Sequence, residues 1–251
     1  MASDQIKAPS LLLQMMELRA PYELAGTMML WPLLRAAPRG DGHAVLVLPG
    51  LLAHDRSTAL LRRFLKQRGY APHGWEQGNN LGPRAGVLEG LIGRLDALHA
   101  SSGGRVSVVG WSLGGIYARM LANERPEAVR NVIMLGSPIG GQPRASNAWR
   151  LYERVSGRRA DDVSDWVRAE HNESVPSTSI YTETDGVVAW RNSLQASGEM
   201  AENIRVHASH LGLGVNAAVL YAVADRLAQP EGGWQPFEPP SLLRHAYPQA
   251  N

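Results

Sequence analysis

Short apolar runs alternate with longer segments of helical periodicity through the middle of the chain. The run Ala44–Leu48 is continuously apolar and ends at Pro-Gly, which predicts a strand buried on both faces. β-branched and apolar residues predict two further buried strands, at 105–110 and 129–138. Amphipathic spacing predicts helices at 56–69, 84–101 and 113–127.

The second half of the chain continues this alternation. Positions 177–186 predict a strand followed by a turn, 202–210 alternate as another strand, and 215–228 predict a closing helix, while 70–78 is a weaker strand candidate. Strands that alternate with helices predict βαβ units in one domain over residues 1–251, with a mainly parallel sheet. In such a sheet, ligand chemistry lies at the carboxyl ends of the strands.

Two segments depart from the alternation. Leu and Met dominate from Leu11 to Leu34, but charged residues and prolines interrupt the run too often for it to span a bilayer. We expect one or two short helices that cover the sheet; a membrane- or substrate-facing amphipathic segment is the alternative. Residues 140–176 mix tryptophans with polar residues, which predicts a helical insertion over the sheet edge. A substrate-binding lid and a plain connector both fit this insertion.

Composition removes several classes of function. The 251 residues include no cysteine, which excludes a disulfide framework, a thiolate zinc site and a cysteine nucleophile. The net charge is only +2 and the arginines are scattered, so no dense basic face indicates nucleic-acid binding. The N-terminus lacks a basic segment followed by an uninterrupted apolar core, and we therefore expect a cytoplasmic protein without stable membrane insertion.

The stretch GWSLGG matches the pattern G-x-S-x-G between a predicted strand and a predicted helix. A serine on such a sharp turn adopts strained backbone angles, and its neighbours approach the adjacent strands closely. Gly110 and Gly114 relieve that crowding. Ser112 also precedes a helix N-terminus, where negative charge is favoured. These features predict that Ser112 is a nucleophile.

A serine nucleophile needs a histidine base that a carboxylate orients. His171, His207 and His210 follow Ser112 before the final tail. His171 lies in the predicted insertion, and His207 falls within an alternating run that predicts a strand side chain. His210 lies in the loop before the last helix, so we favour His210 as the base.

Asp185 is the favoured acid because Asp-Gly directly after a strand forms a tight turn at the sheet end. Glu183 is expected inside the strand, and Asp161, Asp162 and Asp165 are expected at a solvated helix start. The backbone N–H of Leu113 and the N–H of Leu51, in the loop after the first core strand, are the expected oxyanion donors.

The motifs GWSLGG, TETDGVV and ASHLGLG resemble the catalytic set of the α/β-hydrolase family, particularly its bacterial esterase and lipase branch, and LGSPIGG is also similar to lipases. The resemblance covers residues 42 to 228. It implies an α/β-hydrolase fold and hydrolysis of small carboxylic esters through an acyl-serine intermediate, without cofactor or metal. The first core loop reads LPGLL where many lipases carry His-Gly.

Other functions remain open at this point. A thioesterase or acyltransferase that acts on carrier-bound acyl groups is the alternative enzyme, and a catalytically silent ligand receptor is the alternative outside enzymes. The Leu- and Met-rich segment and the tryptophans of the insertion favour an apolar acyl group in the substrate. The run G212-L-G-V-N-A217 resembles a dinucleotide fingerprint but comes too late in the chain for the returning strand that this motif requires.

Overall fold

A six-stranded, fully parallel sheet organises the computed structural model, which describes residues 5–163 and 172–248. The strand order is β2-β1-β3-β4-β5-β6. The strands are β1 Ala44–Leu48, β2 Ala71–Gly74, β3 Val106–Trp111, β4 Val129–Leu135, β5 Ser177–Tyr181 and β6 Ala201–Arg205. This arrangement confirms the predicted α/β class and the parallel sheet.

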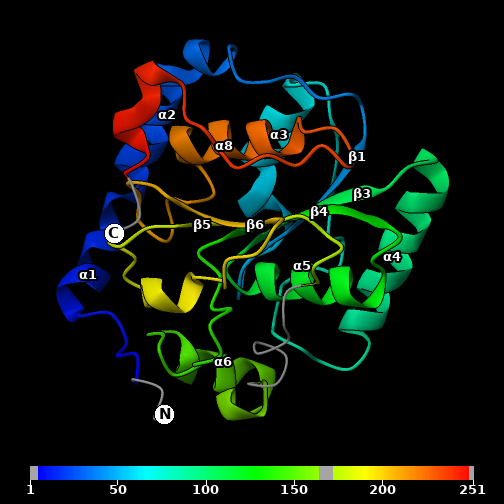
Figure 1. Cartoon of the computed structure of the whole chain (residues 1–251). Helices are drawn as coiled ribbons and strands as arrows, with labels where there is room; N and C mark the ends of the chain where they lie inside the picture. The colour runs from blue at the N-terminus through cyan, green and yellow to red at the C-terminus, as the bar shows by residue number, and fades with distance from the viewer. Residues whose placement is uncertain (1–4, 164–171, 249–251) are drawn as a thin grey trace.

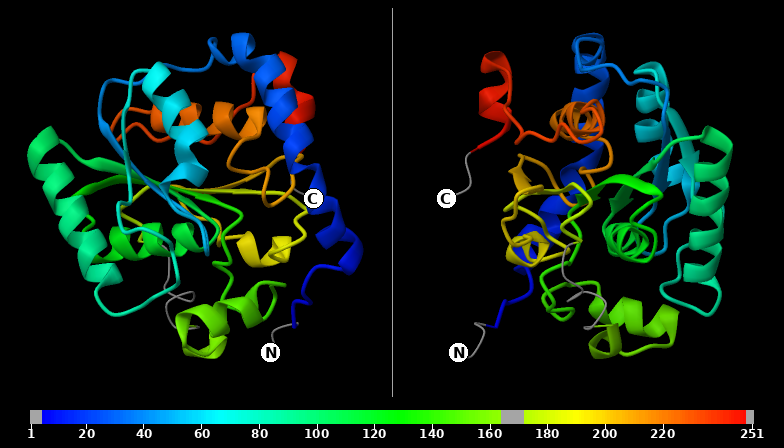
Figure 2. Two further views of the ribbon diagram at one scale, coloured as in Figure 1. Left: turned by 180° about the vertical axis from the view of Figure 1, so that it is seen from behind. Right: turned by 45° about the vertical axis from the view of Figure 1, so that its right-hand side comes forward.

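Helices cover both faces of the sheet (Figures 1 and 2). The helices are α1 Leu11–Met16, α2 Ala20–Leu34, α3 Ala59–Gln67, α4 Val87–Ser102, α5 Leu113–Glu124, α6 Trp149–Ser156 and α8 Ala217–Leu227. Short 3₁₀ helices lie at η1 Glu17–Arg19, η2 Asp55–Thr58, η3 Ala160–Val163, η4 Trp190–Ser193 and η5 Ser241–Ala246.

Alternate side chains of β1 enter two separate hydrophobic cores, one on each face of the sheet. Val45 and Val47 of β1 pack with α3 and α8 on one face, whereas Leu46 and Leu48 pack with α4 and α5 on the other. Burial on both faces explains why the central strands are continuously apolar. None of the helices within the described residues has the length and hydropathy needed to cross a membrane.

Two expectations need correction. The strand predicted at 202–210 ends at Arg205, because β6 lies at the edge of the sheet formed by the described residues, and β5, with which it pairs, ends at Tyr181 opposite Arg205. His207 is therefore an exposed loop residue rather than a strand side chain. Likewise β5 ends before Glu183, which lies in the following turn and pairs with Arg205 at 2.5 Å.

The N-terminal segment differs from a simple sheet cover. Leu34 at the end of α2 enters the core beside α3 and α8, but α1 contributes no buried residue. The α1–η1–α2 segment runs down one edge of the molecule (Figure 1). Its first half lies against the loops that follow β5 and β6, as its hydrogen bonds to both loops show.

Candidate active site

Ser112 occupies the sharp turn between β3 and α5. Its backbone angles, φ 53° and ψ −119°, lie in a region that L-residues rarely adopt. A Cβ placed on Gly110 would lie 2.3 Å from the carbonyl oxygen of Gly114, and one on Gly114 would lie 2.4 Å from that of Leu48. Both glycines are therefore required by backbone packing, as the sequence pattern predicts.

The position of the turn also determines the electrostatic environment of Ser112. Ser112 is the N-cap of α5, a helix of 12 residues, so its side chain lies at the positive end of the helix dipole. Its own N–H donates to the carbonyl oxygen of Leu135 at 2.8 Å, which ties the turn to the end of β4. The site consequently favours a negative charge that develops next to Ser112.

Asp185 and His210 form a buried hydrogen-bonded pair. His210 Nδ1 lies 2.7 Å from Asp185 Oδ2, and both side chains are almost completely excluded from solvent. The second carboxylate oxygen of Asp185 accepts the N–H groups of Val187 at 2.8 Å and Val188 at 2.7 Å. The carboxylate is thus fixed from one side by backbone donors and can orient the imidazole on the other.

The loops that carry this pair meet the serine turn at the carboxyl edge of the sheet. Trp111, next to Ser112, donates from its indole N–H to the carbonyl oxygen of His210 at 3.1 Å. A Cβ on Gly136, directly after β4, would lie 3.1 Å from His210 Nδ1 and 3.3 Å from Asp185 Oδ2. Gly136 also has φ 57°, so the close approach and the backbone conformation both favour glycine there.

The Ser112 hydroxyl makes no hydrogen bond to the His210 ring within the described residues. Catalytic hydrogen bonds in unliganded enzymes are often long and shorten when the substrate binds. The structure brings Asp185 and His210 together through side chains, and joins them to the Ser112 turn through Trp111 and Gly136.

One expected oxyanion donor directly follows Ser112 in the chain, and the other lies in the loop after β1, whose Gly50 approaches Ser112 closely. Leu113 is the first residue of α5, so its N–H has no partner within the helix. Leu51 lies in the loop after β1, and Leu51, Ser112 and Leu113 line one pocket.

Asn80 holds the loop after β1, a role that the sequence did not reveal. Its side-chain Nδ2 donates to the carbonyl oxygen of Pro49 at 2.8 Å, and its backbone carbonyl oxygen accepts the N–H of Leu52 at 2.7 Å. Leu52 has φ 61°, an unfavourable conformation for leucine. Contacts from the buried Asn80 thus maintain a strained loop that carries one expected oxyanion donor.

Charged neighbours raise the pKa of His210. Burial on its own lowers this pKa, but the charge of Asp185, the hydrogen bond to Asp185 and the charge of Glu17 together outweigh burial. The imidazole is therefore better able to accept a proton than an ordinary histidine.

Glu17 is a second residue that sequence reasoning missed. Its buried carboxylate accepts three backbone N–H groups: from Gly186 at 2.8 Å, from His210 at 3.0 Å and from Leu211 at 2.9 Å. One side chain of η1 thereby joins the turn after Asp185 to the loop of His210. The only sequence signal was an acidic residue within an apolar run.

Glu23 and Arg19 reinforce the same contact. Glu23 accepts the N–H of Ser209 at 2.7 Å and pairs with Arg19 at 3.2 Å. Arg19 in turn donates to the carbonyl oxygen of Ala208 at 2.6 Å and to the hydroxyl of Thr184 at 2.7 Å. The charged residues that interrupt the N-terminal apolar run therefore all bind the loops that carry Asp185 and His210.

The pocket beside Ser112 is small and mainly apolar. Its walls come from α5, from α6 and η3 of the predicted insertion, and from the turn after Asp185; they include Leu113, Ile116, Trp149, Tyr152, Ala160, Val187 and Val188.

Residues 164–171 of the insertion, with Asp165, Trp166 and His171, lie outside the described residues. Asp161 pairs on the surface with Arg144 at 2.7 Å.

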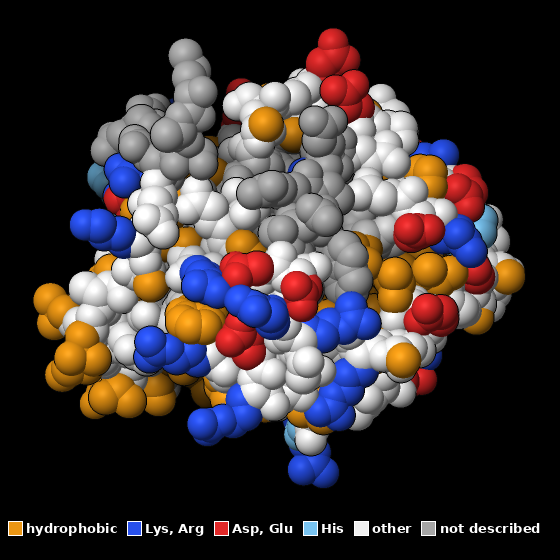
Figure 3. Space-filling model, turned by 90° about the horizontal axis from the view of Figure 1, so that it is seen from below, with side chains coloured by type: hydrophobic (Ala, Val, Ile, Leu, Met, Phe, Trp, Pro, Cys, Tyr) orange, Lys and Arg blue, Asp and Glu red, His pale blue; other side chains and the backbone are white. Residues whose placement is uncertain are grey.

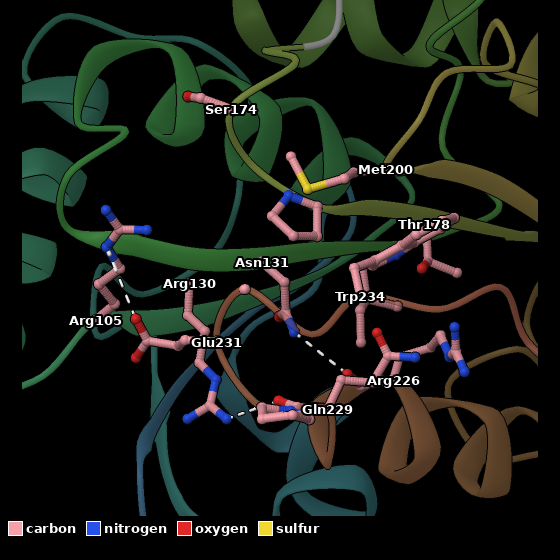
Figure 4. A pocket seen from close by; sticks show the side chains of 14 residues that line it. Arg105, Arg130, Asn131, Ser174, Thr178, Met200, Arg226, Gln229, Glu231 and Trp234 are labelled. Carbon is pink, nitrogen blue, oxygen red and sulfur yellow. Dashed lines mark hydrogen bonds and ion pairs between the residues drawn. The ribbon is translucent and has the colours of Figure 1, made fainter.

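A cavity of about 200 Å³ lies at the opposite end of the sheet. Figure 4 shows its lining, which includes Arg130 and Asn131 at the start of β4 and Thr178 at the start of β5. It is therefore far from Ser112, and its Arg130 guanidinium is already engaged by Asp41 and by the carbonyl oxygen of Gln229.

A second Ser-His-Asp series lies at this amino edge of the sheet. His43 Nε2 is 2.8 Å from the Ser107 hydroxyl, and His43 Nδ1 is 2.5 Å from Asp41. Ser107, however, is completely buried near the start of β3, and it lacks the positive φ of the elbow residue Ser112. Burial also lowers the pKa of His43, since it outweighs the hydrogen bond to Asp41. We interpret this series as a structural hydrogen-bond chain.

Comparison with known proteins identifies the fold. No family model and no curated protein matches the sequence. Lipase B of Aspergillus fumigatus superposes with a TM-score of 0.59 at 17% identity, over 79% of this chain and 56% of that chain. An α/β superfamily hydrolase of Oenococcus oeni gives 0.54 at 15% identity, over 74% and 91%. The Bacillus licheniformis lipase BlEst2 gives 0.52 at 16%, over 75% and 92%.

The chain has the α/β-hydrolase fold. It spans just over half the length of the Aspergillus lipase. In an α/β-hydrolase the nucleophile lies on a strand-to-helix elbow, and the acid and the histidine follow it in the chain. Here the elbow joins β3 to α5, the Asp185 turn follows β5, and the His210 loop follows β6. The positions of all three candidate residues agree with this order.

Proposed function

We propose that this α/β-hydrolase is a serine carboxylesterase or lipase. The buried Asp185–His210 pair beside the strained Ser112 elbow is the observation that carries the proposal. A carboxylate held by backbone donors orients an imidazole of raised pKa, and the loop that carries this imidazole is bonded to Trp111, next to a serine at a helix N-terminus. That combination is suited to acyl transfer rather than to ligand binding alone.

The reaction follows from these positions. His210 Nε2 removes the hydroxyl proton as Ser112 Oγ attacks the ester carbonyl carbon. The N–H groups of Leu51 and Leu113 stabilise the oxyanion, and loss of one such donor costs about 3 kcal/mol. His210 then protonates the leaving alcohol, which leaves an acyl-serine. Water repeats the attack, with His210 as base, and releases the carboxylic acid.

The apolar walls of the pocket indicate the type of acyl group. Leu113, Ile116 and Val188 offer no hydrogen bond from their side chains to a polar acyl chain, whereas they would bury methylene groups favourably. The small pocket favours short acyl chains. We therefore expect higher kcat/KM for butyrate esters than for palmitate esters in a monomeric assay.

The test is a chain-length series of p-nitrophenyl esters, run beside the matching acyl-thioesters. We expect ester hydrolysis that falls by about 10⁴-fold or more in Ser112→Ala, with an unchanged circular dichroism spectrum. Turnover of the thioesters alone would favour the carrier-bound acyl alternative. Retention of ester turnover in Ser112→Ala would overturn the proposal.

A further inference from the structure

The outer surface of the α1–η1–α2 segment is apolar almost without interruption. Between Leu11 and Leu33, every exposed side chain except Gln14 is apolar or aromatic. Leu18, Tyr22 and Met29 are 79%, 80% and 82% exposed. In Figure 3 a broad hydrophobic patch lies at the left edge of the molecule, where Figure 1 places α1, and Lys and Arg side chains border it. Contiguous apolar patches of this kind mark interaction surfaces.

Apart from Gln14, the polar residues between Leu11 and Leu33 face the protein. Glu17 and Thr27 are buried, while Arg19 and Glu23 are half-buried and bind the catalytic loops. The segment is thus polar toward the protein and apolar toward the outside, the reverse of an ordinary surface helix. Contacts within this domain do not explain why the outer surface of the segment is apolar.

The apolar surface of α2 extends around most of the helix. At 3.6 residues per turn, the exposed positions from Pro21 to Leu33 cover roughly two thirds of the circumference. A folded protein partner that packs against one side would leave much of this arc in water. Acyl chains of a lipid layer can surround a projecting helix, so they fit the arc better.

The exposed charges of the same region are all positive. In residues 5–39 the exposed charged side chains are Lys7, Arg35 and Arg39, which flank the apolar segment at both ends. Both acidic residues of that range, Glu17 and Glu23, are turned inward. Cations at the two ends of an apolar helix complement an anionic lipid surface.

We propose that the α1–η1–α2 segment docks this protein onto an anionic lipid surface, with Leu18, Tyr22 and Met29 inserted among the acyl chains and Lys7, Arg35 and Arg39 at the headgroups. The segment lies flat on the surface. Because Glu17 on its inner side binds the His210 loop directly, that loop is held roughly one helix diameter, about 10 Å, from the lipid.

The test is sedimentation with large unilamellar vesicles, which does not depend on esterase activity. The vesicles contain phosphatidylcholine alone or phosphatidylcholine with 30 mol% phosphatidylglycerol. We expect the wild-type protein to bind the anionic vesicles more tightly, and 0.5 M NaCl to weaken binding. The triple substitution Leu18→Ser, Tyr22→Ser and Met29→Ser should reduce the partition coefficient at least about tenfold.

A conservative triple variant, Leu18→Met, Tyr22→Phe and Met29→Leu, keeps the same positions apolar and should bind as the wild type does. The circular dichroism spectrum serves as the folding control and should be unchanged in both variants. Equal vesicle binding by the serine variant would overturn the proposal. Absence of wild-type binding, with a dimer in light scattering that the serine variant dissociates, would show instead that the face joins two copies.

Discussion

The carboxylate of Glu17 accepts the backbone N–H of His210 at 3.0 Å across 193 positions of sequence. The same carboxylate accepts the N–H of Gly186, next to Asp185. Glu17 is therefore a positioning residue: it fixes the two loops whose side chains form the Asp185–His210 pair, and its charge acts on His210.

Variants of His210 and His207 distinguish the proposed base from a nearby exposed histidine. His210→Asn should lower ester kcat by several orders of magnitude, because Ser112 loses its proton acceptor. His207 is exposed, so His207→Asn should leave turnover close to the wild-type value. Steady-state kinetics of both variants checks this expectation, and the opposite ranking would reassign the base.

The raised pKa of His210 sets the pH dependence. The base must be neutral to accept a proton, so kcat/KM should rise with pH along a limb whose midpoint lies above about 6.5, the ordinary histidine value. A pH–rate profile measured with a p-nitrophenyl ester checks this midpoint. A profile that is flat from pH 5 to 9 would argue against a histidine base.

A variant of Glu17 tests whether this residue acts on the pKa of His210 or only supports the loops around it. Glu17→Gln removes a charge that raises the pKa of His210, so the acidic limb should move to lower pH while kcat falls about tenfold or more. The control is Glu89→Gln, at an exposed position of α4, which should change neither quantity. A loss of activity without movement of the limb would reduce Glu17 to a purely structural role.

The close backbone packing at the Ser112 elbow predicts how a glycine substitution there changes the free energy of unfolding. Gly114→Ala would place a Cβ 2.4 Å from the carbonyl oxygen of Leu48, and overpacking of this kind costs about 1–3 kcal/mol. Gly93→Ala, in α4, meets nothing within 4 Å and should be neutral or stabilising by up to about 1 kcal/mol. Urea unfolding of the two variants measures the contrast; equal free energies of unfolding would refute it.

Local features were predictable from the sequence, and features made by distant contacts were not. The elbow and the Asp185 turn are recognisable because glycine spacing and strand patterning lie within a few residues of each side chain. Glu17 and Asn80 were missed because their roles depend on loops that the fold brings to them. The apolar–polar alternation through His207 was misleading because strand length also depends on the neighbour, and β5 ends first.

The most direct test of the account is the site at which a fluorophosphonate probe attaches, mapped by mass spectrometry of peptides. The probe bonds to serines that an adjacent base activates. We predict one labelled residue, Ser112, with labelling abolished by Ser112→Ala and unaffected by Ser107→Ala. Labelling of Ser107, of another serine, or of none would contradict the assignment of Ser112 as the nucleophile.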